Sequence, residues 1–259
     1  MIDGMGRRYA AEFLGTFAII FFGCGSITTV GNGGGIAGHL TVNLVFGFTV
    51  TAMIYALGHL SAAHFNPAVT LGFATARRFP WRYVVPYWVS QFAGAILGSA
   101  FHFLLFSEKA TAARYGATIP AVSLGSALSV EMVLTFFLML VIISVATDRR
   151  VNGAAPGLAI GFTVAFAGLF GGPLSGCSMN PARSLAPALF SGGAALESLW
   201  IYFIGPALGA VLGAIAYEAM RGSEEHAQGA PNDLYTALKQ IEQTRMDSKE
   251  SRSLYQPKN

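Results

Sequence analysis

The chain has 259 residues, of which 53% are hydrophobic and only 11% are charged, and its formal net charge is +3. Soluble domains carry about a quarter charged residues, so this composition excludes an ordinary soluble domain and favours a protein with several membrane spans. The basic residues form short scattered clusters, which does not indicate nucleic-acid binding. Cys24 and Cys177 form neither a disulfide framework nor a pattern of metal ligands.

Six apolar stretches of about 20 residues are long enough to cross a hydrocarbon core of about 30 Å. They are predicted at 9–29, 39–60, 83–106, 123–146, 155–173 and 198–220. An Asn-Pro-Ala triplet follows the second and the fifth stretch, and each triplet continues as an apolar segment too short to span. The sequence therefore predicts an all-α membrane protein with six transmembrane helices and two re-entrant half-helices.

The distribution of basic residues predicts the orientation of these spans. Arg7 and Arg8 precede the first span, whereas the opposite side of the chain has only Lys109 and Arg114. The other basic residues on the side of Arg7 are Arg77, Arg78, Arg82, Arg149, Arg150 and Arg221. Because cytosolic loops carry an excess of Lys and Arg, both termini are expected in the cytosol. No cleavage pattern follows Arg8, so the first stretch is interpreted as a retained span.

The two halves of the chain resemble each other in sequence. The stretch "AEFLGTF" at 11–17 is similar to "VEMVLTF" at 130–136, and "QFAGAILG" is similar to "PALGAVLG" in the last span. Three spans per half place the second half in the membrane from the opposite side, as an inverted repeat with its site near the midplane. The expected organisation is a cytosolic N-terminus at 1–8, a membrane domain at 9–221 with repeats at 9–106 and 123–220, and a polar cytosolic tail at 222–259.

Each Asn-Pro-Ala triplet is predicted to begin a helix, because Asn is a favoured N-cap and Pro is favoured at the first helical position. The triplets are Asn66, Pro67 and Ala68, and Asn180, Pro181 and Ala182. If both half-helices begin at the membrane centre, their positive dipole ends meet there. A neutral Asn caps through its carbonyl and can present two N–H donors to a lumen, which would interrupt a proton-conducting chain of waters. Simple helix capping is the alternative, and the paired positions disfavour it.

Helical rise places three further residues at one depth, slightly outside the midplane. These residues are Phe46 in the second span, Gly168 in the fifth, and Arg183 in the second half-helix. A charge inside a membrane is costly, so Arg183 is a functional candidate that would donate to solute oxygens and repel cations. A structural ion pair is the alternative, which is weak because no acid lies near Arg183 in the sequence.

The segments "GHLSAAHFNPAVT" at 58–70 and "SGCSMNPARS" at 175–184, with the Ala11-Glu12 start, resemble the major intrinsic protein family of aquaporins and aquaglyceroporins. The resemblance covers about residues 8 to 220, and residues 64–81 resemble the plant nodulin-like branch. It implies an aquaporin-like fold and a passive channel in the lipid bilayer for water and small uncharged solutes. It also implies a homotetramer in the plasma or inner membrane, no enzyme activity, no cofactor and no metal.

The resemblance further implies a selectivity filter of Phe46, Gly168, Cys177 and Arg183. Strict water channels usually have His where this chain has Gly168, so we expect a wider and less polar constriction. Glycerol, urea and metalloid hydroxides then become candidate solutes, while protons and ions are excluded. The Asp and Lys that are typical of glycerol facilitators are absent, so the expected substrate range is mixed. The sulfur of Cys177 is expected to face the lumen at the depth of Arg183.

Three more residues are candidates for lining or supporting the pore. Glu12 and Glu131 are repeat-related acids, and the resemblance favours a structural role in which they accept backbone N–H bonds before each half-helix. A proton relay is the alternative. His64 is expected to line the cytosolic half of the pore, with a pH gate as the alternative. The competing function for the whole chain is an ion-coupled alternating-access transporter, which would need titratable or cation-binding groups instead of two neutral amides.

Overall fold

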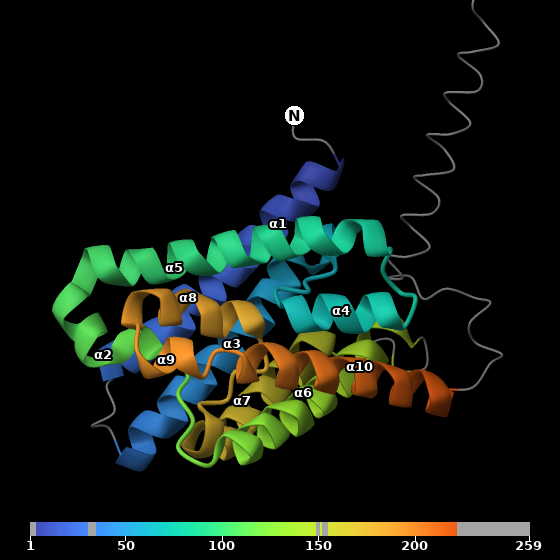
Figure 1. The fold of residues 1–259 in the computed structure, drawn as a ribbon. Coiled ribbons are helices and arrows are strands. Elements are labelled where there is room, and N and C mark those ends of the chain that lie inside the picture. Colours follow the sequence, from blue (N-terminus) through green and yellow to red (C-terminus); the bar gives the residue numbers. More distant parts are fainter. Residues whose placement is uncertain (1–3, 31–34, 149–150, 152–154, 222–259) are drawn as a thin grey trace, which may run out of the picture.

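A computed structural model describes residues 4–30, 35–148, 151 and 155–221, which are helical with short connections (Figure 1). Six helical segments within these ranges are long and apolar enough to cross a membrane. They are Gly4–Val30, Gly35–Ser61, Trp81–Ala112, Leu124–Thr147, Pro156–Ser175 and Ala194–Arg221. The predicted all-α fold with six membrane spans is confirmed. The predicted tail at 222–259 lies outside the described residues.

The first span contains a change of helix type. Helix α1 (Gly4–Ala18) continues through a π-helical segment (Ile19–Cys24) into α2 (Gly25–Val30). The ring of Phe46 packs so closely over Gly23 that a Cβ at this position would overlap it. Local π-helical segments are frequent at functional sites, and this one lies against a candidate filter residue. Apolar periodicity alone did not predict it.

The remaining spans follow the predicted stretches with small shifts at their ends. Their helices are α3 (Gly35–Ser61), α5 (Val84–Ala112), α6 (Leu124–Thr147), α7 (Pro156–Ser175) and α10 (Ile201–Arg221). The predicted sixth span at 198–220 lies within the segment Ala194–Arg221, in which a short helix, α9 (Ala194–Glu197), and a turn precede α10. Helix α5 includes a non-helical residue, Phe106, which lies at the end of the predicted third span.

The two half-helices, α4 (Pro67–Thr75) and α8 (Pro181–Ser191), lie end to end inside the bundle (Figure 1). Helix α4 packs against α10, and α8 packs against α5. The chain reaches each of them through a non-helical approach with left-handed backbone. The residues with positive φ there are Ala62, Ala63 and Phe65 before α4, and Gly176, Cys177 and Met179 before α8. Such conformations are costly for residues other than Gly, so the surrounding structure must hold both approaches in place.

Equivalent glycines bring the long helices of each repeat into close contact. A Cβ at Gly94 of α5 would overlap the backbone carbonyl of Phe13 in α1. The same relation holds between Gly209 of α10 and the carbonyl of Met132 in α6. Small residues let helix backbones approach closely where lipid provides no hydrophobic driving force between helices. The two similar glycine-rich stretches in the sequence therefore make equivalent packing contacts.

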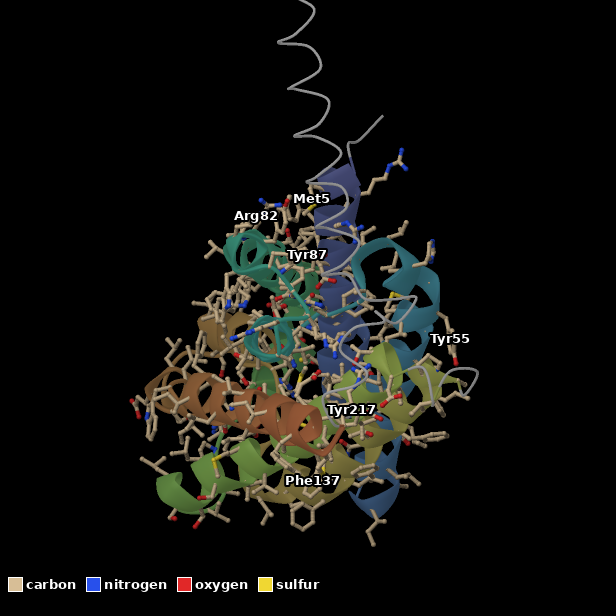
Figure 2. The ribbon with its side chains drawn as sticks, turned by 90° about the vertical axis from the view of Figure 1, so that its right-hand side faces the viewer. Met5, Tyr55, Arg82, Tyr87, Phe137 and Tyr217 are labelled. Atoms are coloured by element: carbon tan, nitrogen blue, oxygen red, sulfur yellow. The ribbon has the colours of Figure 1, made fainter. Side chains whose placement is uncertain are left out.

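The outer surface of the bundle is apolar. Phe137 points away from the helices (Figure 2) and is 51% exposed, and Phe170 and Leu104 are more exposed still. Several charged and polar side chains are instead buried, among them Glu12 and Glu131. A large exposed apolar surface around a buried polar interior is the distribution that lipid surroundings require.

Candidate pore and selectivity filter

A cavity of about 1050 Å³ runs through the bundle and passes both Asn-Pro-Ala triplets. Its lining extends from Gly38, near the start of α3, to Arg78, which follows α4. Asn66 and Asn180 both lie on its wall. None of the described residues that line this cavity is Asp or Glu. The structure thus contains a cavity with a mixed polar and apolar lining and with the caps of both half-helices at its wall.

Both triplets cap their half-helices in the same way. Asn66 Oδ1 accepts a hydrogen bond from the backbone N–H of Ala68 at 2.9 Å. Asn180 Oδ1 accepts one from Ala182 at 3.0 Å and another from Arg183 at 3.3 Å. The following proline occupies the first helical position in each case. These bonds satisfy the first free N–H groups of each helix, as capping by Asn predicts.

The two asparagine amides also join the repeats across the centre of the molecule. Asn66 Nδ2 donates to the carbonyl of Met179 at 2.7 Å, and Asn180 Nδ2 donates to the carbonyl of Phe65 at 3.0 Å. Each amide group has two N–H donors, and one of them is used in this bond. The expectation that both donors face the lumen is therefore wrong. One N–H per triplet is left for a passing solute, while the other holds the approach to the opposite half-helix.

Glu12 supports the approach to α4 through both carboxylate oxygens. Its Oε1 accepts from the backbone N–H of His64 at 3.0 Å, and its Oε2 accepts from Phe65 at 2.7 Å. The Ser61 hydroxyl and the Gln91 amide each donate to the same carboxylate at 2.7 Å. The donors of this irregular backbone therefore have carboxylate acceptors in a fully buried position, where an unmet N–H is costly.

Glu131 makes the equivalent bonds in the second repeat. Its Oε1 and Oε2 accept from the backbone N–H groups of Ser178 and Met179, both at 2.8 Å. Ser175 donates to Oε1 at 2.7 Å, as Ser61 does to Glu12. Both carboxylates are fully buried and engaged in these bonds. The structural role is favoured over a proton relay for this reason.

Arg183 lies on the cavity wall, buried and opposite an aromatic ring. Its guanidinium carbon is 5.2 Å from the centroid of the Phe46 ring. Its Nη1 donates to the carbonyl of Gly116 at 2.7 Å, which orients the group. Among the described residues no carboxylate forms an ion pair with Arg183. The remaining donors of the guanidinium are available to solute oxygens, and its charge opposes cations.

The space beside Gly168 is not empty. A Cβ at Gly168 would overlap Oδ1 of Asn43, whose side chain comes from α3 and occupies that position. His39 lies one turn earlier on α3, and a Cβ at Gly172 would be 2.7 Å from its Cε1. The expectation of a less polar constriction at Gly168 is therefore wrong, because a polar amide stands beside this glycine, while the greater width of the constriction stays a prediction. Sequence reasoning missed Asn43, although His39 and Asn43 stand four residues apart in a mainly apolar span and thus on one face.

Cys177 lines the cavity and is partly exposed, whereas Cys24 is fully buried in the first span. The backbone N–H of Cys177 donates to the hydroxyl of Ser175 at 3.3 Å, and its φ of 45° is left-handed. Its position on the wall makes the thiol a candidate for metal or reagent access. That its sulfur faces the narrowest point stays a prediction.

His64 is packed into the wall of the cavity. Its Nδ1 lies 3.1 Å from the hydroxyl of Thr70, and its ring stacks on Phe73 with centroids 4.7 Å apart. The rings of Phe79 and Tyr87 also contact it. A histidine enclosed by aromatic rings in this way is held in one orientation, which favours a lining role over a movable gate.

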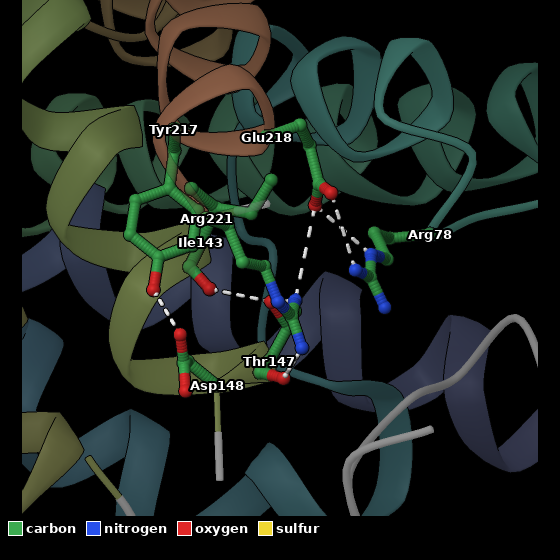
Figure 3. A network of polar contacts seen from close by, with 7 residues as sticks. All are labelled: Arg78, Ile143, Thr147, Asp148, Tyr217, Glu218 and Arg221. Carbon is green, nitrogen blue, oxygen red and sulfur yellow. Dashed lines mark hydrogen bonds and ion pairs between the residues drawn. The ribbon is translucent and has the colours of Figure 1, made fainter. Parts of the chain in front are cut away.

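A polar network near the end of α10 meets the cavity wall through Arg78 and Thr147. Figure 3 shows its side chains, which belong to Arg78, Thr147, Asp148, Tyr217, Glu218 and Arg221. Arg78 donates to both carboxylate oxygens of Glu218, at 3.0 and 3.2 Å. Arg221 donates to the hydroxyl and the carbonyl of Thr147, both at 3.0 Å. The network joins the segment after α4 to the ends of α6 and α10, and sequence analysis did not predict it.

Comparisons with known proteins agree with this architecture. Residues 4–217 match the sequence profile of the family described as Major intrinsic protein. The chain is 46% identical over 215 residues to "Aquaporin NIP1-1" of Oryza sativa subsp. japonica, covering 83% of this chain and 74% of that protein. It is 42% identical over 228 residues to "Aquaporin NIP2-3" of Zea mays, with 88% and 74% covered.

A solved structure has the same fold and a similar sequence. The X-ray structure of the aquaglyceroporin from Plasmodium falciparum superposes with a TM-score of 0.75 at 25% identity, covering 83% of this chain and 96% of that chain. The chain belongs to the major intrinsic protein family and is an integral membrane channel for water and small solutes.

Proposed function

We propose that this channel conducts water together with small uncharged solutes that carry hydroxyl or amide groups, and that it excludes protons and ions. The observation that carries this proposal is the chemistry of the cavity wall. Its described lining has no carboxylate, and it includes Arg183 and both triplet asparagines. Amide and guanidinium donors within a partly apolar wall bind neutral oxygen-bearing solutes, and the positive charge of the arginines opposes cations.

Proton exclusion follows from the arrangement at the triplets. Helices α4 and α8 both direct their N-terminal, positive dipole ends toward the cavity centre. The N–H that each asparagine retains for the lumen donates to the oxygen of a passing water. The hydrogens of that water then point away from the centre, so the hydrogen-bonded chain of waters reverses direction there. This reversal blocks proton hopping while water continues to pass.

The filter roles of four residues belong to this proposal. Phe46 and Arg183 form one side of the constriction through their ring–guanidinium contact. Gly168 and Cys177 line the same cavity. The names of the relatives support a mixed substrate range, since they include aquaporins and an aquaglyceroporin. An ion-coupled transporter is not supported, because Glu12 and Glu131 are committed to backbone donors.

We also propose the assembly and the orientation of the protein. The family resemblance supports a homotetramer in the cell membrane with the membrane domain at 9–221, to which α1 adds residues from Gly4. Arg78 and Arg221 share the carboxylate of Glu218 at one end of the bundle, which supports placing that end and both termini in the cytosol. Chemical cross-linking in membranes and protease access in sealed vesicles test these two statements.

Stopped-flow light scattering of proteoliposomes tests the function directly. Water, glycerol, urea and boric acid are applied as separate gradients, and a pH-sensitive dye inside the vesicles reports proton leak. We expect fast, non-saturating flux of water and of at least one solute, without proton leak above that of empty liposomes. Flux that saturates, or that collapses when the proton gradient is removed, would instead identify a transporter.

A further inference from the structure

The side chain of Asn43 occupies the part of the filter that Gly168 leaves open. Asn43 lies on α3 one turn before Phe46, is 7% exposed, and lines the cavity. Its Oδ1 stands where the Cβ of residue 168 would be, so a larger residue there and Asn43 exclude each other. Gly168 therefore does not act as an opening. It acts as the space into which an amide from the neighbouring helix fits.

The hydrogen bonds of His39 determine which way this amide faces. His39 Nε2 lies 3.0 Å from the carbonyl of Leu169, which can only accept, so Nε2 carries the proton and Nδ1 is an acceptor. Asn43 Nδ2 donates at 2.8 Å to the carbonyl of His39, and it lies 3.3 and 3.5 Å from Nδ1 and Nε2 of the His39 ring, beside the ring rather than in line with one nitrogen. The bond to the carbonyl holds the NH2 group of the amide toward α3. The reversed amide would place its oxygen against the His39 carbonyl, which is unfavourable.

The amide oxygen is left as an acceptor on the pore wall. None of the described residues donates a hydrogen bond to Asn43 Oδ1. This oxygen is also not among the fully buried polar atoms that have no partner, so part of its surface is accessible. Arg183 supplies donors against the ring of Phe46, one turn further along α3. The filter therefore carries an acceptor as well as donors.

We propose that Asn43 is a specificity-determining residue of this channel. Its side chain replaces the one missing at Gly168 and binds neutral solutes that can both donate and accept hydrogen bonds. Polyols, urea and trihydroxy acids such as boric acid have this chemistry. A solute long enough can donate a hydrogen bond to Asn43 while it accepts one from Arg183. These two bonds replace hydrogen bonds to water that the solute loses at its two ends. This inference rests on the proposed function and adds its specificity determinant. His39 is the positioning residue that orients the amide.

The decisive variant is Asn43→Leu, which keeps a similar volume and removes the acceptor. One hydrogen bond contributes about 1 kcal/mol, so we expect the ratio of glycerol or urea permeability to water permeability to fall about fivefold. Thr41→Leu is the matched control, because Thr41 lies on the same helix, is exposed and does not line the cavity. An unchanged ratio in Asn43→Leu, with water flux intact, overturns the proposal.

A second pair of variants tests the competition for space. Gly168→Ala is expected to displace the Asn43 amide and lower solute flux several-fold, because its Cβ has no room. Asn43→Ala combined with Gly168→Ala makes room again, so water flux should recover while the preference for polyols and urea stays lost. The proposal is also overturned if Gly168→Ala alone leaves every flux at the wild-type value. Purified yield and water flux report whether each variant folds.

The wild-type fluxes separate this inference from the proposed function. If wild-type liposomes pass water but no probe solute, the proposed solute range is wrong. In that case the side chain of Asn43 would still limit which solutes pass the wild-type filter. Asn43→Ala, which removes this side chain beside Gly168, is then expected to admit glycerol. If Asn43→Ala and Asn43→Leu both leave all fluxes unchanged, Asn43 does not determine specificity, whatever the wild-type channel conducts.

Discussion

Removing the carboxylate of Glu131 should destabilise the channel by a large fraction of its folding free energy. In Glu131→Ala, the backbone N–H groups of Ser178 and Met179 lose their acceptor, and so does the hydroxyl of Ser175. A buried donor left without a partner costs about 1–3 kcal/mol, so the two N–H groups alone cost about 2–6 kcal/mol. Whole domains are stable by only about 5–15 kcal/mol. Glu131→Gln keeps one acceptor oxygen and the shape, so its cost should be about 1–3 kcal/mol.

Thermal unfolding in detergent, followed by near-ultraviolet circular dichroism, measures this order. For a chain of this size, each kcal/mol of lost stability lowers Tm by about 2–4 °C. The Tm of Glu131→Ala should therefore be at least about 4 °C below that of wild type, and the Tm of Glu131→Gln should fall by less. Water flux should decline in the same order, because the approach to α8 loses its support. Glu197→Gln, at an exposed position in α9 near the start of the last span, is the control. Equal Tm values and equal fluxes for wild type and Glu131→Ala would refute the structural role of the carboxylate.

Three further predictions concern the filter and the helix packing. Mercuric chloride should inhibit flux, because the soft sulfur of Cys177 binds mercuric ion at the cavity wall. Cys177→Ser should remove this inhibition and Cys24→Ser should not. The opposite pattern would show that the reactive thiol is not that of Cys177. Arg183→Ala should raise proton leak, measured with an internal pH dye, because the fixed positive charge is lost; a leak equal to wild type would assign exclusion to the triplets alone. Gly209→Val should lower Tm far more than a change at the exposed Gly125, since its side chain meets the Met132 carbonyl; equal effects would contradict the close α6–α10 contact.

The sequence by itself determined the fold class, the six spans and the two half-helices. Composition and span length depend only on the chemistry of lipid and water, and an Asn-Pro start acts on the backbone next to it. The family was also evident, because the residues around Asn66 and Asn180 are contiguous. Glu12 and Glu131 stand at matching positions of the two repeats, and the resemblance to the family implied their role as acceptors of backbone N–H bonds.

Only the tertiary structure decided how residues from distant segments share space and donors. The sequence suggested a gap at Gly168, but the volume there belongs to Asn43, which lies more than a hundred positions earlier. In the same way, Asn66 and Asn180 each use one N–H on the opposite repeat, and Arg78 meets Glu218 at the rim. Periodicity and capping describe a chain and its own neighbours. The width and polarity of a filter depend on which side chains from several helices reach one point, and that is decided by packing.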